Sequence, residues 1–303
     1  MRGELQQQLY AIDPIFFMQK DWDMTKTCMC WGIECGDGWF EPIKKFVMGV
    51  SQLNKIAASV GMAIVASQIK SKWADFTCYW NIVPLDESNS AELDEQQQAI
   101  VDNVYWLMDA AVDACENECS RTCEICGKSS PFEDEIIACG SWLTVKCLDC
   151  AQKQQREEGI ITNASDGFMF LSPFAKCSIA VDGVKYPTFI GAYYGKLHPQ
   201  YKTLFASVFE PRDAQNVAVE LGLCKADDGC LPIMEELLKA RYNENNRERS
   251  GLLSTKGLQI KLFNRSHENF WGECTCPVCK KQSSNTNNYG KLLMKVRDEL
   301  LNG

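Results

Sequence analysis

The sequence lacks any long apolar run. No stretch approaches the roughly 18 consecutive apolar residues that a membrane-spanning helix needs. Its opening residues, MRGELQQQLY, lack the basic-then-apolar profile of a secretory signal. We also find no internal repeat and no extended low-complexity tract. These absences predict a soluble, cytoplasmic protein that has no membrane partner.

Excess positive charge is also lacking, because the formal net charge is −9. A protein whose main role is to coat nucleic acid needs basic surface, so this balance argues against that class. It leaves room for a small basic opening to one site. With 46% hydrophobic and 23% charged residues, the composition is that of a folded globular protein. A length of 303 residues is enough for two domains.

Two polar stretches divide the chain. The stretch at 151–167 follows a cysteine cluster and precedes the aromatic, strand-like run FMFLSPF (168–174). We therefore place a domain boundary there, with a first domain at 1–155 and a second domain at 166–303. The stretch at 84–98 is expected to separate elements inside the first domain.

Hydrophobic periodicity predicts more helix than strand. Apolar residues recur at helical spacing in four segments, at 46–60, 97–119, 233–242 and 292–300. Strand and loop are expected at 64–80, and short strands at 168–171, 178–181 and 258–263. The expected fold class is α+β, and the second domain is expected to be mainly helical.

Seventeen cysteines are present. In a reducing compartment, metal binding or free thiols are commoner than disulfides. Cys123-x2-Cys126 and Cys147-x2-Cys150 are separated by 20 residues, at the upper edge of zinc-ribbon spacing. Two such pairs direct four thiolates at one centre, and a closed four-thiolate zinc site is structural. The alternative is a set of buried free cysteines. Cys139, between the pairs, is expected to stay a spare thiol.

The segment CGDGW (35–39) carries two glycines around Asp37, which suit a tight turn that leads into a helix. A functional carboxylate at Asp37 is the alternative. With this segment, an aromatic strand and paired CxxC motifs, the first half resembles small zinc-ribbon proteins of tailed bacteriophages. The resemblance implies a phage origin, and hence the host bacterial cytoplasm, but no particular function.

The second half carries an ordered series of short motifs. The early ones are FLSPF (170–174), DGVKYPT (182–188) and IGAYYGK (190–196). The later ones are LLST (252–255), FWG (270–272) with Glu268 before it, and NNYGKLLM (287–294) followed by Arg297. In this order the series resembles the NADAR (YbiA-like) family of N-glycosidases, and it covers nearly the whole second domain.

The resemblance implies a nucleophilic lysine at Lys196. A neutral amine there would attack the anomeric carbon as the base departs, and ring opening would then give a Schiff base that water resolves. This mechanism requires a pocket that lowers the lysine pKa. Glu268 would stabilise the oxocarbenium-like transition state. Trp271 would form a wall of the pocket and stack on a base or a flavin-like ring, and Asn287 would bind ribose or cap the last helix. The substrate-binding residues implied in this way are Ser172, Phe174, Tyr193, Trp271, Gly272 and Asn287.

The first-helix motif departs from the family pattern. Where the family has Glu and then His, this chain has Ile190 and Gly191, and the register before Lys196 is one residue short. The loss of that carboxylate makes a non-catalytic, ligand-binding descendant the main alternative to an enzyme.

A second cysteine cluster follows Trp271. Cys274, Cys276 and Cys279 would need a fourth metal ligand, which His267 or Cys177 could supply. The alternative is a cysteine-rich turn that packs the pocket rim. The neighbouring pair at 280–281, two lysines, is expected to be solvated charge or to meet a phosphate.

Three functional hypotheses follow. The first is an N-glycosidase that removes ADP-ribose from guanine in nucleic acid, as a phage counter-defence against DarT-type toxins. A base in a duplex would then have to be flipped out. The same activity could act on an ADP-ribose-containing small molecule or on a riboflavin precursor. The second hypothesis is a non-catalytic protein that binds an ADP-ribose-type nucleotide or a host protein. In the third, the zinc ribbon tethers nucleic acid and the second domain is a scaffold.

Overall fold

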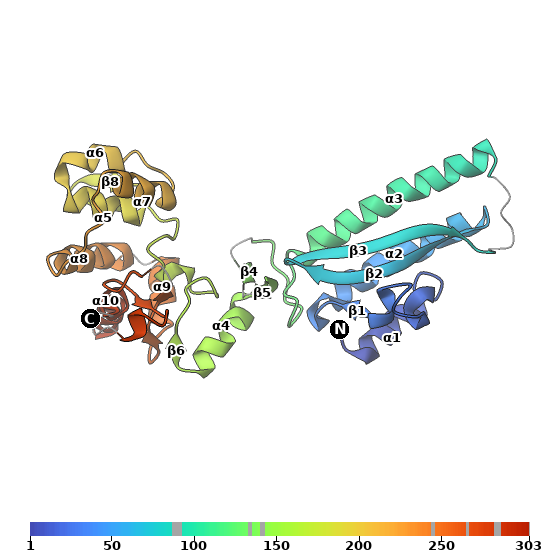
Figure 1. Ribbon diagram of the computed structural model, residues 1–303, viewed down its shortest axis with the longest axis horizontal. Helices are drawn as coiled ribbons and strands as arrows, with labels where there is room; N and C mark the ends of the chain where they lie inside the picture. Colours follow the sequence, from blue (N-terminus) through green and yellow to red (C-terminus); the bar gives the residue numbers. More distant parts are fainter. Residues whose placement is uncertain are drawn as a thin grey trace. The chain divides into compact units, whose positions relative to one another are not determined.

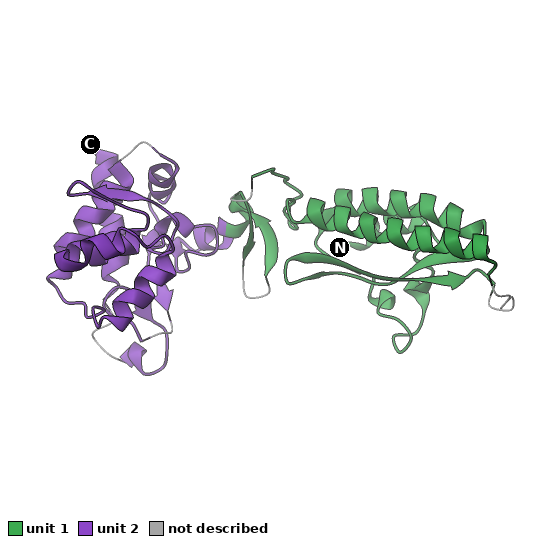
Figure 2. Ribbon diagram, turned by 90° about the horizontal axis from the view of Figure 1, so that it is seen from above, with its two compact units in different colours: residues 1–151 green, residues 152–303 purple. Residues whose placement is uncertain are grey.

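The computed structural model of the protein describes residues 1–86, 93–132, 135–139, 143–243, 246–264, 267–281 and 286–302. They form two units, Met1–Ala151 and Gln152–Gly303, each with its own hydrophobic core (Figures 1 and 2). Both units combine helices with strands, so the expected α+β class is confirmed. Part of the polar stretch at 84–98 lies outside the described residues. Of the described helices, none has both the length and the apolar character that crossing a bilayer requires.

The first unit is built from helices around a three-stranded sheet. Its elements, with η for a 3₁₀ helix, are α1 (Gly3–Ile12), η1 (Met18–Asp21), η2 (Met29–Trp31), β1 (Ile33–Glu34), η3 (Asp37–Trp39), α2 (Phe40–Ala58), β2 (Met62–Lys72), β3 (Asp75–Pro84), α3 (Glu95–Cys119), β4 (Ile136–Cys139) and β5 (Thr144–Cys147). Helix α4 (Leu148–Glu157) crosses the boundary to the second unit.

A long antiparallel hairpin, β2–β3, supports helices α2 and α3, which lie side by side along it (Figure 2). Both helices agree with the sequence prediction. On α2 the side chains of Ile43, Val47 and Val50 recur at helical spacing and are fully buried. Helix α3 begins with a capping box, in which the side chains of Asp94 and Gln97 each accept the other residue's backbone N–H.

The CGDGW segment packs its backbone against the first cysteine pair. A Cβ atom at Gly36 would lie 2.2 Å from the carbonyl oxygen of Glu124, and one at Gly38 would lie 2.1 Å from that of Cys123. Both glycine N–H groups donate to Glu124 at 2.9 Å, one to its side chain and one to its carbonyl oxygen. The predicted turn into a helix is confirmed, and Asp37 pairs with the N-terminal segment. The glycines are therefore required by this close approach.

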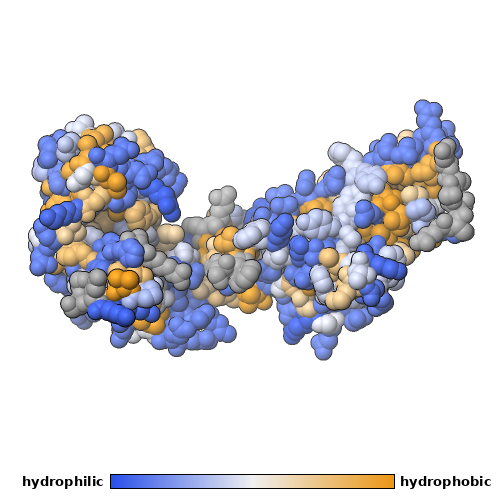
Figure 3. Space-filling view, in the orientation of Figure 1, coloured by the Kyte–Doolittle hydropathy of each residue, from blue (hydrophilic) through white to orange (hydrophobic). Residues whose placement is uncertain are grey.

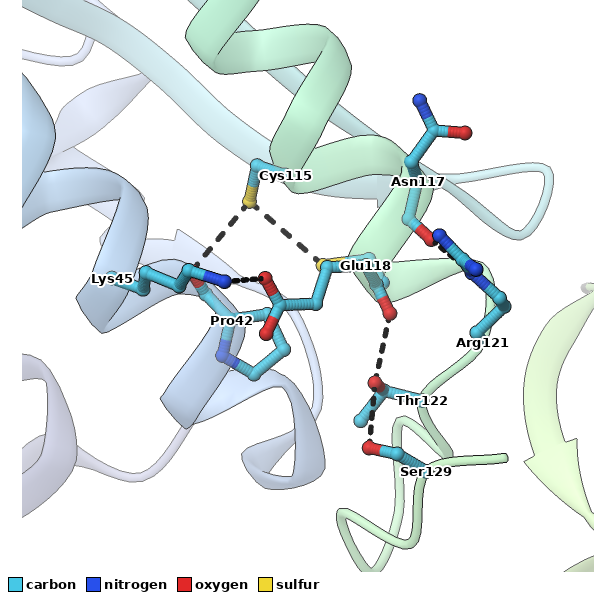
Figure 4. A network of polar contacts seen from close by, with 9 residues as sticks. Pro42, Lys45, Cys115, Asn117, Glu118, Arg121, Thr122 and Ser129 are labelled. Atoms are coloured by element: carbon cyan, nitrogen blue, oxygen red, sulfur yellow. Dashed lines mark hydrogen bonds and ion pairs between the residues drawn. The ribbon is translucent and has the colours of Figure 1, made fainter. Parts of the chain in front are cut away.

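A polar network joins the C-terminal end of α3 to α2 and to the loop that carries the first cysteine pair (Figure 4). The carbonyl oxygen of Glu118 accepts a hydrogen bond from Thr122 Oγ1 at 2.8 Å, and that hydroxyl lies 3.1 Å from Ser129 Oγ. The carboxylate of Glu118 pairs with Lys45 of α2 at 2.9 Å. The end of α3 therefore fixes both α2 and the loop that carries the first CxxC pair.

The second unit is mainly helical, as predicted. After α4 its elements are β6 (Ile160–Ile161), η4 (Met169–Leu171), β7 (Ile179–Val181), β8 (Val184–Tyr186), α5 (Phe189–Leu197), η5 (Pro199–Tyr201), α6 (Lys202–Phe205), α7 (Pro211–Glu220), α8 (Cys230–Asn243), α9 (Arg247–Leu253), β9 (Gln259–Ile260), β10 (Phe263–Asn264), β11 (Glu273–Cys274), η6 (Cys279–Lys281) and α10 (Asn288–Asn302). The strands pair as β6–β9, β7–β8 and β10–β11.

Helix α5 is the centre of this unit. Seven consecutive residues from its start are buried, because α6, α7 and α8 pack around it. The side chain of Thr188 caps the helix by accepting the N–H of Gly191 at 3.0 Å. A Cβ at Gly191 would lie 2.9 Å from the carbonyl oxygen of Phe205, and one at Gly195 would lie 2.6 Å from the ring of Tyr186. Both glycines therefore allow neighbouring segments to approach the helix.

The strand expected at 168–171 is wrong, because this segment forms the 3₁₀ helix η4. Its carbonyl groups face donors from α8 instead of a neighbouring strand. Tyr242 Oη donates to the carbonyl oxygen of Phe170 at 2.5 Å, and Arg241 Nη1 donates to that of Ser172 at 2.8 Å. The strand expected at 178–181 is β7, and the one expected at 258–263 divides into β9 and β10.

Substitution of Gly38 by Ala is expected to destabilise the first unit by about 2–3 kcal/mol, because the new Cβ would overlap a carbonyl oxygen. The control is Gly49→Ala, at an exposed position of α2 with open space around the Cβ, which should gain about 0.5–1 kcal/mol. Denaturant unfolding followed by circular dichroism measures both. Equal unfolding midpoints for the two variants would contradict the close approach.

Candidate functional site

A cavity of about 810 Å³ opens in the second unit. This volume lies within the range of small-molecule binding sites. Figure 3 shows apolar residues gathered around a hollow in this unit. The lining comes from η4, α5, α7, α8, β10 and the start of α10, and from the loops that follow β6, η4 and α7 and precede β11.

Six of the residues implied by the NADAR resemblance line this one cavity. They are Ser172, Phe174, Tyr193, Glu268, Trp271 and Gly272. Ile190, at the position where the family pattern has glutamate, lines it too. The fold thus brings together three segments that are far apart in the sequence, at 172–174, 190–193 and 268–272. In the sequence, the order of the motifs was the sole reason to group them.

Glu268 holds the loop that carries Trp271. Its Oε1 atom accepts the backbone N–H groups of Phe270 at 2.9 Å and Trp271 at 2.7 Å, and its Oε2 atom accepts that of Gly272 at 2.8 Å. A Cβ at Gly272 would lie 2.8 Å from Asn264 Nδ2, which itself donates to the carbonyl oxygen of Glu268. Hydrogen bonds to a carboxylate are stronger than those between neutral groups. This side chain therefore fixes the conformation of the loop.

Aromatic side chains form one wall of the cavity. The rings of Tyr193 and Trp271 meet edge to face, with centroids 5.8 Å apart. Burial and a hydrogen bond with Cys230 raise the pKa of Tyr193. Burial also raises the pKa of Tyr194, whose Oη donates to Gln215 Oε1 at 3.1 Å. Both phenols are therefore neutral hydrogen-bonding groups near pH 7.

Lys196 is absent from the described lining of the cavity. Its Nζ atom forms ion pairs with Asp182 Oδ2 at 2.8 Å and Glu236 Oε1 at 2.6 Å. Burial lowers the pKa of Lys196, but the hydrogen bonds to the two carboxylates outweigh burial and raise that pKa above the usual lysine value. The condition for an amine nucleophile, a neutral lysine facing the cavity, is therefore not met in this structure.

Asn287 is buried and is also absent from the described lining. The side-chain Nδ2 atom of Asn287 donates to the backbone carbonyl oxygen of Ile260 at 2.9 Å. The backbone carbonyl oxygen of Asn287 accepts the backbone N–H of Lys291 at 3.1 Å. Its φ angle of +49° lies in the left-handed region, which asparagine tolerates better than most residues. The described contacts of Asn287 therefore join the start of α10 to β9.

Arg241 is a buried charge that the sequence analysis missed. Its side chain is 1% exposed, and Nε and Nη2 donate to the carboxylate of Glu248 at 2.8 and 3.0 Å. Nη1 donates to the carbonyl oxygen of Ser172, and the guanidinium lies over the rings of Phe189 and Tyr242. An arginine on a helix is usually exposed, so nothing in the sequence marked this one as buried.

Two residues that line the cavity, unlike Arg241, were missed as well. Arg212 is an exposed cation in the first turn of α7. Tyr289 has a buried Oη atom without a hydrogen-bond partner among the described residues, and burial raises its pKa. A buried hydroxyl without a partner costs about 1–3 kcal/mol. Tyr289 stands where the family motif has leucine, and this difference is the signal that could have revealed it.

Two groups of side chains could hold a metal ion, and the one in the first unit comprises Cys123, Cys126, Cys147 and Cys150. Their sulfur atoms lie within 4.8 Å of one another, and those of Cys126 and Cys147 are 3.7 Å apart. Tetrahedral zinc with bonds of about 2.3 Å separates its sulfurs by about 3.8 Å, so the geometry fits. Gly127, at a φ angle of +76°, closes the turn of the first pair by donating to the carbonyl oxygen of Cys123. Cys139 is outside the group.

The other group lies in the second unit and comprises His267, Cys274, Cys276 and Cys279. Of the two fourth ligands considered from the sequence, His267 belongs to the group and Cys177 does not. The two lysines at 280–281 lie in η6 and are absent from the described cavity lining.

Substitution of Arg241 by Ala is expected to destabilise the second unit by about 3–5 kcal/mol, because it leaves Glu248 without its buried partner. The control is Arg249→Ala on α9, whose guanidinium makes an exposed bond to a backbone carbonyl and should contribute less than about 1 kcal/mol. Denaturant unfolding of both variants measures the difference. A midpoint for Arg241→Ala close to that of the control would refute a structural role.

The comparisons with known proteins add one finding. No protein-family model matches the sequence, and no curated protein matches it either. Among solved structures, the chain is similar to the NMR structure of YbiA from E. coli, a NADAR-family protein, at 23% sequence identity. The similarity covers 48% of this chain and 90% of YbiA, with a TM-score of 0.37. Because this score is too low to establish a shared fold, the resemblance to the NADAR family rests on the ordered motifs of the sequence.

Proposed function

We propose that the cavity of the second unit binds a ligand that joins an aromatic base to phosphates, of the ADP-ribose type, without cleaving it. The observation that carries this proposal is the composition of the wall. Aromatic rings and the cation of Arg212 line the cavity, whereas its described lining contains no lysine and no carboxylate besides Glu268.

The aromatic lining suits a nucleobase. Trp271 and Tyr193 already meet edge to face, which leaves ring surface for a planar ligand. At the rim, Met169, Phe174 and Phe263 are 50%, 44% and 44% exposed. Exposed apolar side chains gathered around one cavity are typical of a binding site, because contact between apolar surface and water is unfavourable until a ligand covers that surface.

Arg212 suits a phosphate group. It lies one helical turn from Gln215 on α7, and both side chains line the cavity. A guanidinium can donate two parallel hydrogen bonds to phosphate oxygens, and the amide of Gln215 adds a polar group on the same helix face. This end of the cavity would be the small basic opening that the acidic composition leaves room for.

Two features argue against cleavage through a lysine. The ion pairs of Lys196 keep its amine protonated, and a protonated amine has no lone pair for attack. Ile190 presents an apolar side chain to the cavity at the position of the family's glutamate. Binding is therefore the function that the residues present support best.

A second candidate, an N-glycosidase that uses water as nucleophile, is favoured by one observation. Oε2 of Glu268 accepts one described hydrogen bond, from Gly272, and the residue lines the cavity. Its remaining lone pair could face an oxocarbenium-like transition state. The substrates in that case would be ADP-ribosyl guanine in nucleic acid, as in a phage counter-defence against a DarT-type toxin, an ADP-ribose-containing small molecule, or a riboflavin precursor.

The metal group of the first unit fits structural zinc. Four thiolates form a closed set, so no position remains for a substrate. Zinc there would cross-link the first CxxC pair, the end of β5 and the first turn of α4. A nucleic acid or a host protein is the partner class proposed for this unit.

Calorimetric titration of the full chain with ADP-ribose tests the proposal. Trp271→Ala should weaken binding at least about tenfold, because one stacked base is worth about 1–3 kcal/mol. Lys196→Ala is the control and should bind as the wild type does, because this side chain is outside the described lining. Mass spectrometry of single-stranded DNA that carries ADP-ribosyl guanine should detect no released ADP-ribose.

Each other result has a definite meaning. Release by both the wild type and Lys196→Ala would overturn the non-cleaving proposal in favour of the route through Glu268. Release that Lys196→Ala abolishes would restore the lysine mechanism. Absence of ADP-ribose binding and of release would refute the binding proposal and leave the second candidate only with a riboflavin precursor as substrate.

Tyr289→Phe tests the role of the hydroxyl at the cavity wall. Because Tyr289 Oη has no partner among the described residues, its removal should leave the stability of the second unit unchanged or slightly raised. If the hydroxyl forms a hydrogen bond with the ligand, the binding free energy of ADP-ribose should become less favourable by about 1 kcal/mol or more. Loss of stability without loss of affinity would show that the hydroxyl serves the fold.

A further inference from the structure

A histidine and three cysteines meet close to the cavity wall. His267 Nδ1 lies 3.4 Å from Cys276 Sγ and 3.3 Å from Cys279 Sγ. Cys274 supplies the fourth possible ligand atom, and the four atoms all lie within 4.8 Å of one another. Cys274 and Cys279 are buried. Tetrahedral zinc with bonds of about 2.1 Å to nitrogen and 2.3 Å to sulfur would separate these atom types by about 3.6 Å, close to what is observed.

The backbone around the cysteines has the form of a metal-binding turn. The N–H of Cys279 donates to Cys276 Sγ at 3.2 Å, and the N–H of Lys280 donates to the carbonyl oxygen of Cys276 at 3.0 Å. Asn269 Nδ2 donates to Cys279 Sγ at 3.4 Å, which is the kind of outer hydrogen bond that orients a metal ligand. Three sulfurs and one nitrogen form a closed set that zinc favours, with no open position for catalysis.

The four ligands enclose the loop that forms the cavity wall. His267 precedes residues 268–273 and Cys274 follows them, so a metal bound to both would close this loop covalently. Three cavity-lining residues, Glu268, Trp271 and Gly272, lie inside it. The strands on either side, β10 and β11, are two residues long and supply few backbone bonds of their own. A short loop closed by a cross-link has far less conformational entropy than a free one.

We propose that His267, Cys274, Cys276 and Cys279 bind a second structural zinc ion, and that this ion holds the Trp271 loop in place as the wall of the cavity. The effect on ligand binding rests on the function proposed above, whereas the zinc site itself does not. This group shares no residue with Cys123, Cys126, Cys147 and Cys150 of the first unit. With both groups occupied, the full chain binds two zinc ions.

Metal analysis of the purified full chain by mass spectrometry tests the site directly. Wild type should contain two zinc ions per chain, and Cys276→Ser should contain one. The matched control, Cys177→Ser, changes the other cysteine considered as fourth ligand and should keep two. X-ray absorption of the wild type should show seven sulfurs and one nitrogen shared by the two ions, which distinguishes His267 from a thiolate ligand.

Hydrogen exchange tests the role of the ion in the loop. In Cys276→Ser the amides of 270–272 should exchange at least tenfold faster than in wild type, and ADP-ribose affinity should fall at least tenfold. The same zinc content in Cys276→Ser as in wild type, or a wild-type absorption spectrum without a nitrogen ligand, would overturn the site. Unchanged exchange in a variant that has lost one zinc would overturn its role in the loop.

The two proposals can fail separately. If wild type binds two zinc ions but no ADP-ribose, the proposed ligand is wrong and the zinc site stands. If Cys276→Ser does not fold, the wild-type zinc count and the absorption spectrum still decide the site.

Discussion

The cavity side of the second unit depends on one buried charge, the guanidinium of Arg241. A buried cation is strongly unfavourable unless it is paired and hydrogen-bonded. Here Glu248 supplies the charge, and the carbonyl oxygen of Ser172 accepts a further N–H. These contacts join α8, α9 and the turn after η4. Together with the hydrogen bond from Tyr242 to the carbonyl oxygen of Phe170, the bond from Arg241 holds the turn that brings Ser172 and Phe174 to the cavity.

The sequence predicted the long helices because their apolar residues recur at helical spacing over several turns. It did not predict η4, because the aromatic run FMFLSPF looks the same in a strand and in a 3₁₀ helix until its hydrogen-bond donors are known. In the first unit, two glycines indicated a turn, but not its contact with a cysteine pair that lies far along the chain. Six residues that motif order grouped together line one cavity in the second unit, whereas Lys196 and Asn287 are outside its described lining.

The position of Lys196 depends on the register of helix α5, which motif order alone does not specify. Ile190, Tyr193 and Tyr194 line the cavity, so the next position on that face of α5 is Leu197. One residue turns a side chain by about 100° around the helix axis. The register before Lys196 is one residue short of the family pattern, and this single step directs the amine to Asp182 and Glu236.

Several of the short motifs in the second unit make contacts that stabilise the fold and lie outside the cavity. Arg297 donates to the carbonyl oxygen of Thr255 at 2.9 Å, so two separate motifs meet as one buried contact. At α5, by contrast, the departures from the family support one another. The backbone of Phe205 fills the space that any side chain at position 191 would need, and Ile190 is buried. Restoring a glutamate at position 190 alone would bury a carboxylate beside apolar neighbours, without room for the histidine that follows it in the family. The changes at positions 190 and 191 are therefore consistent with each other, and they agree with the binding function proposed above.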